Sequence, residues 1–597
     1  MSEPLNTPLE SSRVRRVIDH EDQIAAQWWL NDHRHKHIAV DVETTGLSRD
    51  DTLTSIQFGD RHDAWVLDPN MPGIELIEDL LFHCTHLIAH NAPFDAYHLA
   101  KFSGTTPCFP TLSQQDVLSN MQDTQILSKL VDPRNKGQGG VGHGLKDLAA
   151  HYIGKEATEA QEQLRAGGKQ WDEMSIFDDD FVRYGGMDVI LTARLFYLLN
   201  LKVHDLNVQH LVEFDRQVQQ IVTGMSERGM RVDPIYAEDL YDELGREEDG
   251  YRGMASALGV SNVNSTKEVA SALLLRGHEL TERTPSGDYK VDKVVLGNID
   301  DDICRAVLGA KQANKAMKSW VGPLIDAGNS SDGRVHATIN PSNAVTYRMS
   351  ISDPGLHQLP SNDHRVRSCL IADAGQTLIS CDFSQVELRV VAALAREQSM
   401  IDVFTAGGDI HSATAARLYG EEFTAHQRGL AKNTAFGVVY GGGAATLARQ
   451  AGITPGEAKL TIENFYMQFP GLKRWTSSVI DYVKERRPCV VTYTGRQIPL
   501  DPNFAYKGVN YQVQSLAGDV FKQSLINLDK AGLAEHLLLP IHDEVIAQAP
   551  KAQAAQVARE IETVMSDDLS GVPLTAEAEV IGFRWGDKYA PKEVINA

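Results

Sequence analysis

Four acidic residues and a tyrosine in the first third of the chain have the spacing expected of a metal-dependent catalytic site. Asp41 and Glu43 lie two residues apart in an apolar run, so on a strand both side chains point to one face. Asp95 follows a second apolar run at a predicted helix start, and Tyr184 and Asp188 share one side of a predicted helix. A solvated strand edge is the ordinary alternative for the first pair, and its apolar flanks weaken it. The four carboxylates could hold two Mg²⁺ about 3.5–4 Å apart that activate a water against a phosphodiester, with Tyr184 orienting the water.

A further acidic residue, Asp382, ends the apolar, β-prone run 378–381 and precedes a helix-forming sequence with Gln385, Glu387 and Arg389. This order predicts a buried strand that delivers a carboxylate to a cleft and then turns into a helix. Taken alone, a helix N-cap is the more ordinary role for such an aspartate. A buried carboxylate is costly unless it is paired or holds a metal, so a second acid elsewhere in the chain would decide between the two.

That second acid is Asp543, in the polar tip His542-Asp543-Glu544 between two apolar strands. We expect the strands that carry Asp382 and Asp543 to be neighbours in an antiparallel sheet, where both carboxylates hold two Mg²⁺. Paired carboxylates that hold metal ions suit phosphoryl transfer, in which the protein positions groups and stabilises charge. Glu544 is counted with this catalytic set.

Two cations and two rings recur every four residues at Arg428, Lys432, Phe436 and Tyr440. On a helix they form one stripe that drifts by about 40° per step. The cations suit a triphosphate and the rings suit a stacked base or sugar. An ordinary amphipathic helix is the alternative, but its core face would hardly carry Arg and Lys.

The length and composition of the chain limit how these groups are positioned. With 597 residues, 42% of them hydrophobic, the chain is expected to form several globular domains. Its formal net charge of −23 does not exclude a nucleic-acid partner, because a local basic face can still bind phosphate. Lys311, Lys315 and Lys318 share one helix face and are interpreted as such a grip on duplex DNA, with a solvated charged stripe as the alternative.

The cysteines and the N-terminus indicate the cellular setting. Six widely spaced cysteines without a Cys-x-x-Cys pair predict neither a zinc site nor a disulfide framework, which fits a reducing compartment. No signal peptide or transmembrane run is apparent, so we expect a cytoplasmic protein with no membrane partner.

The N-terminal motifs resemble a known family. Asp-x-Glu at 41–43, Asn-x-x-Phe-Asp at 91–95 and Tyr-x-x-x-Asp at 184–188 are, in that order, the signature of the DEDDy 3′–5′ exonucleases. His-Gly-Leu-Lys-Asp-Leu at 143–148 also resembles that family. The resemblance implies a ribonuclease-H-like exonuclease domain over residues of about 35–205.

The C-terminal part resembles the family A DNA polymerases. Residues 382–389 are close to that family's motif A, residues 428–441 have the spacing of its motif B, and residues 542–544 match its motif C. Residues 346–360 are similar to the segment that contacts the primer end, although Tyr347 stands where the family has glycine. Three further positions depart from the family pattern: His357, Ser515 and Pro540. Proline at 540 fits an edge strand or a strand start better than a central strand.

The resemblance implies a role for each matching residue. Arg348 would contact the primer end from the minor groove, and Glu387 would exclude a 2′-OH and select deoxynucleotides. The expected nucleotide site combines side chains of the three motifs: Arg428, Lys432, Phe436, Tyr440, Glu387, His542 and Gln385. The expected DNA contacts come from the primer-end segment, the basic helix and a helix before motif C that also carries Asp519 and Lys522: Arg348, Lys311, Lys315, Lys318, Asn510 and Gln514.

The expected architecture is a multidomain α/β and α+β chain. A lead-in (1–34) precedes the exonuclease domain (35–205), a thumb with connecting helices (206–335), a palm with an antiparallel sheet (336–400 and 490–597), and helical fingers (401–489). This layout resembles the Klenow-type part of bacterial DNA polymerase I without its 5′-nuclease domain, a form typical of bacteriophage replicative polymerases.

The expected function is template-directed DNA synthesis with 3′–5′ proofreading in phage replication. Primed template DNA and dNTPs are the expected partners of a monomer, together with unidentified replisome proteins such as a helicase, a primase and a single-strand-binding protein. Each active site is expected to use two Mg²⁺, which Mn²⁺ can replace. A pure nuclease would not need Asp382 and Asp543, and a non-catalytic scaffold would not need acids at metal-binding spacings.

Overall fold

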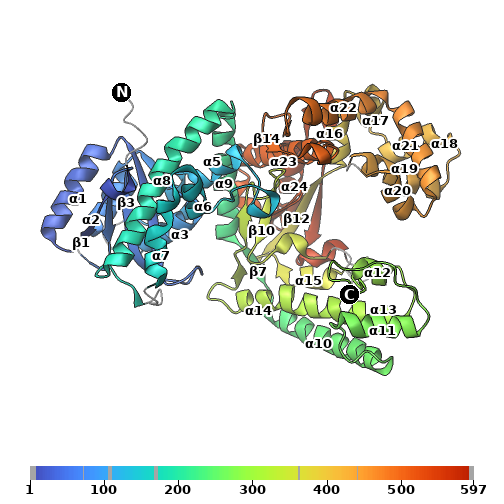
Figure 1. Ribbon diagram of the computed structural model, residues 1–597, viewed down its shortest axis with the longest axis horizontal. Coiled ribbons are helices and arrows are strands. Elements are labelled where there is room, and N and C mark those ends of the chain that lie inside the picture. Colours follow the sequence, from blue (N-terminus) through green and yellow to red (C-terminus); the bar gives the residue numbers. More distant parts are fainter. Residues whose placement is uncertain are drawn as a thin grey trace.

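The computed structural model describes residues 8–71, 73–104, 110–166, 173–360, 363–439 and 442–589. Figure 1 shows the N-terminal third as a mixed layer at the left, a central sheet, and two helical lobes at the right. The lower lobe is formed around residues 234–328 and the upper one around residues 398–481. Within the described part of the chain, every helix is too short or too polar to cross a membrane.

The N-terminal layer contains a six-stranded mixed sheet in the order β1-β4-β3-β2-β5-β6. β3 runs antiparallel to β2 and β4, whereas β1 is parallel to β4, and β5 is parallel to both β2 and β6. The strands are β1 (Arg13–Val17), β2 (His37–Thr44), β3 (Leu53–Gly59), β4 (Asp63–Leu67), β5 (His86–Ala89) and β6 (Met121–Asp123). The helices are α1 (His20–His33), α2 (Ile74–His83), α3 (Ala92–Ser103), α4 (Gln114–Ser119), α5 (Thr124–Val131), α6 (Leu145–Tyr152), α7 (Glu159–Ala166) and α8 (Asp179–Asp205).

The segment before residue 35 is part of this layer. β1 adds an edge strand to the sheet, and α1 begins at an N-cap, Asp19, whose carboxylate accepts hydrogen bonds from the amides of Glu21 and Asp22 at 2.9 and 3.0 Å. The lead-in predicted for residues 1–34 therefore contains a strand and a helix that the predicted boundary at residue 35 left outside the N-terminal domain.

The long helix α8 lies close against the sheet because of two glycines. A Cβ atom at Gly185 would lie 2.6 Å from Nε2 of Gln57, and one at Gly186 would lie 2.3 Å from Cγ1 of Val14. Each glycine costs about 1 kcal/mol of helix propensity relative to alanine. The close approach gives a reason for that cost, since it brings the following turn of α8, with Asp188, against the sheet.

Helix α9 (His210–Arg228) leads from this layer into the lower lobe. There α10 (Pro234–Ala257) packs along α13 (Asp302–Lys315), and the chain continues directly into a π-helix at Ala316–Val321. The remaining helices of the lobe are α11 (Thr266–Leu275), α12 (Lys293–Gly297) and α14 (Gly322–Gly328).

The central sheet is antiparallel and has the order β15-β16-β12-β19. Its strands are β12 (Gln376–Phe383), β15 (Leu537–Ile541), β16 (Glu544–Pro550) and β19 (Ala576–Gly582). β12 and β16 are neighbours, as predicted, and Pro540 lies on the edge strand β15, where a missing amide donor is tolerated. Helix α24 (Ala554–Met565) packs on β12 and β19, and α23 (Lys507–Lys530) packs on α24 and α16 (Val386–Ala395).

Short ladders and the upper lobe complete the fold. The lobe contains α17 (Gln398–Thr405), α18 (Ile410–Tyr419), α19 (Ala425–Val439), α20 (Ala444–Ala451), α21 (Pro455–Gln468) and α22 (Pro470–Asp481). The ladders are formed by β7 (Met230–Val232), β8 (Arg334–Val335), β9 (Thr338–Asn340), β10 (Ser350–Ser352), β11 (Leu370–Ile371), β13 (Cys489–Val491), β14 (Gln497–Pro499), β17 (Asp567–Leu569) and β18 (Val572–Leu574).

A buried ionic network ties α9 to α23 and to the β13–β14 hairpin. Arg496, at 0% exposure, donates to Asp215 of α9 at 2.7 and 2.8 Å and lies 2.9 Å from Asp519 of α23. Lys522, also at 0% exposure, lies 3.4 Å from Asp215. Burial alone would raise the pKa of Asp215, but Arg496 and Lys522 lower it to about 2. Buried charges of this kind are stable only when each is paired and hydrogen-bonded, and here each one is.

Candidate active sites

Three carboxylates converge at the first predicted site. One ligand atom each of Asp41, Glu43 and Asp188 lies within 4.8 Å of the others. On β2 the acids alternate with buried Val40 and Val42, so both point to the face that α8 covers, as predicted. Asp95, in the first turn of α3, accepts a hydrogen bond at 3.1 Å from the amide of Val42. Val42 lies between the two β2 acids, so this hydrogen bond places Asp95 next to the cluster of Asp41, Glu43 and Asp188.

Burial shifts the titration of the acids in this cluster. It raises the pKa of Asp41 to about 7, and it raises the pKa values of Glu43 and Asp95 well above their usual range, with a further contribution from the charge of Asp41. Oxygen-rich clusters of this kind bind Mg²⁺. The donor set therefore fits the predicted metal ions.

Lys146 is a member of this site that the sequence interpretation did not include. Its ammonium forms an ion pair with Asp188 and lies 4.6 Å from the centre of the Tyr184 ring. Burial lowers the pKa of Lys146 to about 8, although the charges of Asp41 and Glu43 oppose that shift. The sequence did contain an indication of this lysine, because it belongs to the segment 143–148 that resembles the exonuclease family.

A hydrophobic side chain beside the cluster was also missed. Leu47 follows β2 by three residues and is 91% exposed, which is unusual for leucine. It lines a pocket of about 190 Å³ with Phe94 and Tyr97 of α3 and with Thr338 and Ile339 of β9. The pocket thus lies where the N-terminal layer meets the rest of the chain.

Asp382 and Asp543 come together at the second predicted site. Asp382 lies within β12 opposite Glu544, and Asp543 lies in the turn between β15 and β16, where its carbonyl accepts from the amide of Phe383 at 3.2 Å. Helix α16 begins only after Gln385, so the N-cap interpretation of Asp382 is wrong. Among the described residues, Oδ1 of Asp382 is buried without a hydrogen-bond partner, as expected of a metal-binding oxygen.

The acids of this site have different surroundings. Burial, followed by the charges of Asp543 and Glu544, raises the pKa of Asp382 to about 7, and burial also raises the pKa of Asp543. Glu544 instead accepts hydrogen bonds from Ser380 and, at 2.7 Å, from Lys588. Lys588, near the end of the described chain, was not predicted. Its ion pair anchors Glu544, which favours a supporting role for this third acid.

The raised pKa values predict how Mg²⁺ stabilises the protein. The pKa values of Asp41 and Asp382 are raised to about 7 in the folded protein from about 4 in the unfolded chain, so the metal-free protein loses stability as the pH rises from about 4 to about 7. Mg²⁺ binds the charged forms and removes this penalty. We expect MgCl₂, compared with EDTA, to raise the melting temperature more at pH 8 than at pH 6. Equal shifts at both pH values in differential scanning fluorimetry would contradict this coupling.

Around the second site, Arg348 and Glu387 contact one another. The guanidinium of Arg348 donates to the carboxylate of Glu387, which lies in the first turn of α16. Gln385 and His542 are exposed, and both have positive φ angles, of 55° and 57°. These four predicted residues therefore cluster near the ends of β12 and β15.

The predicted nucleotide-binding stripe lies on α19. Arg428 donates to Asp409 at 2.6 Å and to Ser412 at 3.0 Å, and Lys432 is exposed. The ring of Phe436 lies 5.8 Å from that of His411 on α18. Tyr440, the fourth residue of the predicted stripe, lies outside the described residues.

The predicted DNA contacts are mostly at the surface. Lys311, Lys315 and Lys318 are all exposed, but Lys318 lies in the π-helix, whose wider turn shifts it from an ideal i+7 position. Asn510 and Gln514 lie on α23 and are half-buried. On the same helix, Asp519 and Lys522 are buried in the Arg496 network, away from the surface.

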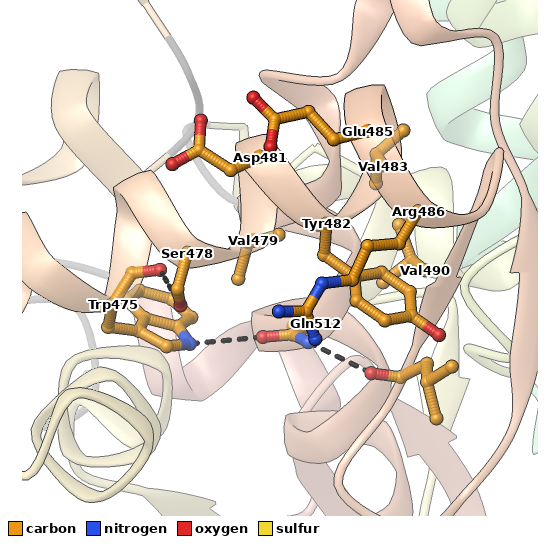
Figure 2. A pocket seen from close by; sticks show the side chains of 11 residues that line it. Trp475, Ser478, Val479, Asp481, Tyr482, Val483, Glu485, Arg486, Val490 and Gln512 are labelled. Atoms are coloured by element: carbon orange, nitrogen blue, oxygen red, sulfur yellow. Dashed lines mark hydrogen bonds between the residues drawn. The ribbon is translucent and has the colours of Figure 1, made fainter.

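One pocket lies apart from both carboxylate sites. Figure 2 shows this cavity of about 760 Å³ beside α22 and α23, where Nε1 of Trp475 donates to Gln512 at 3.0 Å and Gln512 donates to the carbonyl of Val491 at 2.9 Å. Of the predicted site residues that the structure describes, none lines it. The cavity is therefore separate from both carboxylate sites.

Comparisons with known proteins agree with this division of the chain. A family model described as DNA polymerase family A matches residues 236–587, and one described as a 3′–5′ exonuclease matches residues 16–204. A DNA polymerase of Mycobacterium phage D29 is 35% identical, over 96% of this chain and 97% of that protein. A DNA polymerase I of Chloroflexus aurantiacus is 29% identical, over 84% of this chain and 55% of that protein. The fold is shared with the POL domain of Pol1 from M. smegmatis, solved in complex with DNA primer-template and dNTP, at a TM-score of 0.79 and 23% identity over 96% of this chain and 99% of that one.

Proposed function

Because this chain belongs to DNA polymerase family A and carries a 3′–5′ exonuclease domain, we propose that its two carboxylate sites are the polymerase and proofreading centres. The chain is a DNA-directed DNA polymerase with 3′–5′ exonuclease activity. The observation that carries the assignment of residues is the convergence of Asp382 and Asp543 beside an exposed turn, separate from the cluster of Asp41, Glu43 and Asp188.

At the polymerase site, the chain would position the primer and the nucleotide. Asp382 and Asp543 would hold Mg²⁺, which when bound makes the primer 3′-OH a better nucleophile and neutralises phosphate charge. Arg428 and Lys432 would bind the triphosphate, and Glu387 would contact the sugar and disfavour a 2′-OH. The buried, partnerless oxygen of Asp382 supports this assignment. Mn²⁺ would replace Mg²⁺ in the same oxygen-rich site.

At the exonuclease site, Asp41, Glu43, Asp95 and Asp188 would hold the metal ions and Tyr184 would orient the attacking water. The exposed side chain of Leu47 and the rings of the neighbouring pocket suit the unstacked bases of a frayed primer end. Lys146 would place a positive charge beside the phosphate. The lysines of the lower lobe and Asn510 and Gln514 of α23 would contact the duplex along its backbone and minor groove.

From the phage relatives we infer a role in phage DNA replication in the host cytoplasm. The chain would act as a monomer on primed template DNA with dNTPs. Replisome partners such as a helicase, a primase and a single-strand-binding protein belong to the same proposal. In domain terms, we propose a thumb at 206–335, a palm at 336–400 and 490–597, and fingers at 401–489. The exonuclease domain, predicted at 35–205, would also include β1 and α1, which belong to the same sheet layer.

The direct test is extension of a labelled primer on a template with MgCl₂. We expect stepwise extension when all four dNTPs are present and stepwise shortening when they are absent, because the two sites compete for one primer end. EDTA should stop both reactions. Failure to extend with any dNTP mixture would refute the polymerase assignment.

A further inference from the structure

Tyr347 occupies a backbone position that ordinarily calls for glycine. Its φ angle is +61°, in the left-handed region that disfavours residues with a side chain. Yet the ring is 1% exposed and lies in a hydrophobic cluster with side chains of α5, α8 and the β13–β14 hairpin. A side chain kept in an unfavourable conformation and buried completely is held there by its contacts.

Those contacts link the two halves of the molecule. The phenol of Tyr347 donates a hydrogen bond at 3.0 Å to the carbonyl of Lys129 in α5. The guanidinium of Arg496 lies 4.5 Å from the ring centre, and Arg496 is fixed by the buried network with Asp215 and Asp519. The ring therefore bridges a helix of the exonuclease domain and the base of the palm.

On each side the bridge leads to an active site. Asp123, the N-cap of α5, accepts hydrogen bonds at 3.0 and 3.1 Å from the amides of Asn91 and Ala92, where the helix that carries Asp95 begins. On the other side the next residue is Arg348, whose guanidinium contacts Glu387. Helix α23 packs closely against Arg348, because a Cβ atom at Gly518 of this helix would lie 3.5 Å from Cγ of Arg348.

We propose that Tyr347 is a positioning residue that couples the exonuclease domain to the arginine that holds the primer end, and thereby sets how a primer terminus divides between the two active sites. The proposal rests on the proposed function, since it takes Arg348 as the primer-end contact. With the ring in place, the backbone of Arg348 is fixed against α5 and α23. Without it, Arg348 would hold the primer less firmly, and more termini would move to the exonuclease site.

Two variants separate the parts of the contact. Tyr347→Phe removes only the hydrogen bond to Lys129, and Tyr347→Gly restores the family residue and removes the ring. We expect the ratio of excision to extension on a matched primer to rise about threefold in the first and about tenfold or more in the second. Extension by Tyr347→Gly should show a raised KM for primer-template with kcat nearly unchanged. Degradation of single-stranded DNA should stay at the wild-type rate in both, because the exonuclease carboxylates are untouched.

Tyr236→Phe is the matched control. The guanidinium of Arg584 lies 4.6 Å from the centre of the Tyr236 ring, in a cation–π contact away from the exonuclease domain. Tyr236→Phe should therefore leave the ratio of excision to extension unchanged. A ratio within twofold of wild type in both Tyr347 variants would overturn the proposal. So would a parallel fall of all activities with the melting temperature, which would indicate a merely structural role. If the wild-type protein neither extends nor excises, it is the proposed function that fails, and the two failures are distinguishable.

Discussion

Asp543→Asn is expected to abolish primer extension and to leave primer degradation intact. Asparagine keeps the size of the side chain but removes the charge that, with Asp382, would hold the metal ions. Losing a metal ion that neutralises a triphosphate removes several kcal/mol of transition-state stabilisation, so extension should fall by about a thousandfold or more. Excision should continue because the cluster around Asp41 lies in another domain.

The variant should remain folded, and this can be checked. Two like charges repel in the wild type, and the charge of Asp543 helps to raise the pKa of Asp382. Removing it should bring the pKa of Asp382 closer to its usual range and should not lower the melting temperature of the metal-free protein. Asp529→Asn, at the exposed end of α23, is the matched control and should extend normally. If Asp543→Asn extends at more than a few per cent of the wild-type rate, the assignment of this carboxylate is wrong.

Asp41→Ala is expected to have the reverse effect, with loss of excision and normal extension. Asp41 lies on the β2 face that also carries Glu43, and its carboxylate is one of the three that converge. Without it, the remaining acids would bind the metal ions in the wrong number or geometry, and excision should again fall by about a thousandfold or more. The measurement is shortening of a labelled single strand in MgCl₂, with extension of a primed template measured in parallel.

Asp180→Ala provides the control for this variant, because Asp180 is an exposed residue on the same helix as Asp188. It should excise and extend like the wild type. Loss of both activities in Asp41→Ala, or in Asp543→Asn, would contradict the separation of the two sites. In Asp41→Ala, a mismatched primer end should persist, because the excision that would remove it is lost.

The placement of the candidate catalytic acids was predictable because local sequence determines the strand or helix on which each one lies. The two-residue spacing of Asp41 and Glu43 fixes a strand face, and an apolar run before Asp382 and around Asp543 fixes two buried strands. Asp382 and Asp543 lie far apart in the chain, and their pairing was predicted because one carboxylate alone cannot hold two metal ions. The structure agrees with these predictions at the level of strand, face and neighbour.

The residues that were missed depend on contacts that local patterns do not encode. Lys146 is an ordinary helical lysine until folding brings it to Asp188, and Lys588 meets Glu544 from the far end of the chain. Asp519 and Lys522 have the helical spacing of a surface pair, and only their burial against Arg496 shows that they are structural. The shift of Lys318 comes from a π-turn, which no sequence signal predicts.

The buried network of Arg496 determines where this protein can be divided. Asp215, its central carboxylate, lies on α9, which follows the exonuclease domain in the chain but supplies a charge to the palm. A cleavage after Arg228 would leave Arg496 and Lys522 buried without that charge, which costs about 3–5 kcal/mol in such settings. A cleavage before His210 would keep the network whole. If the exonuclease domain were lost or exchanged in evolution, α9 would be expected to remain with the polymerase half of the chain.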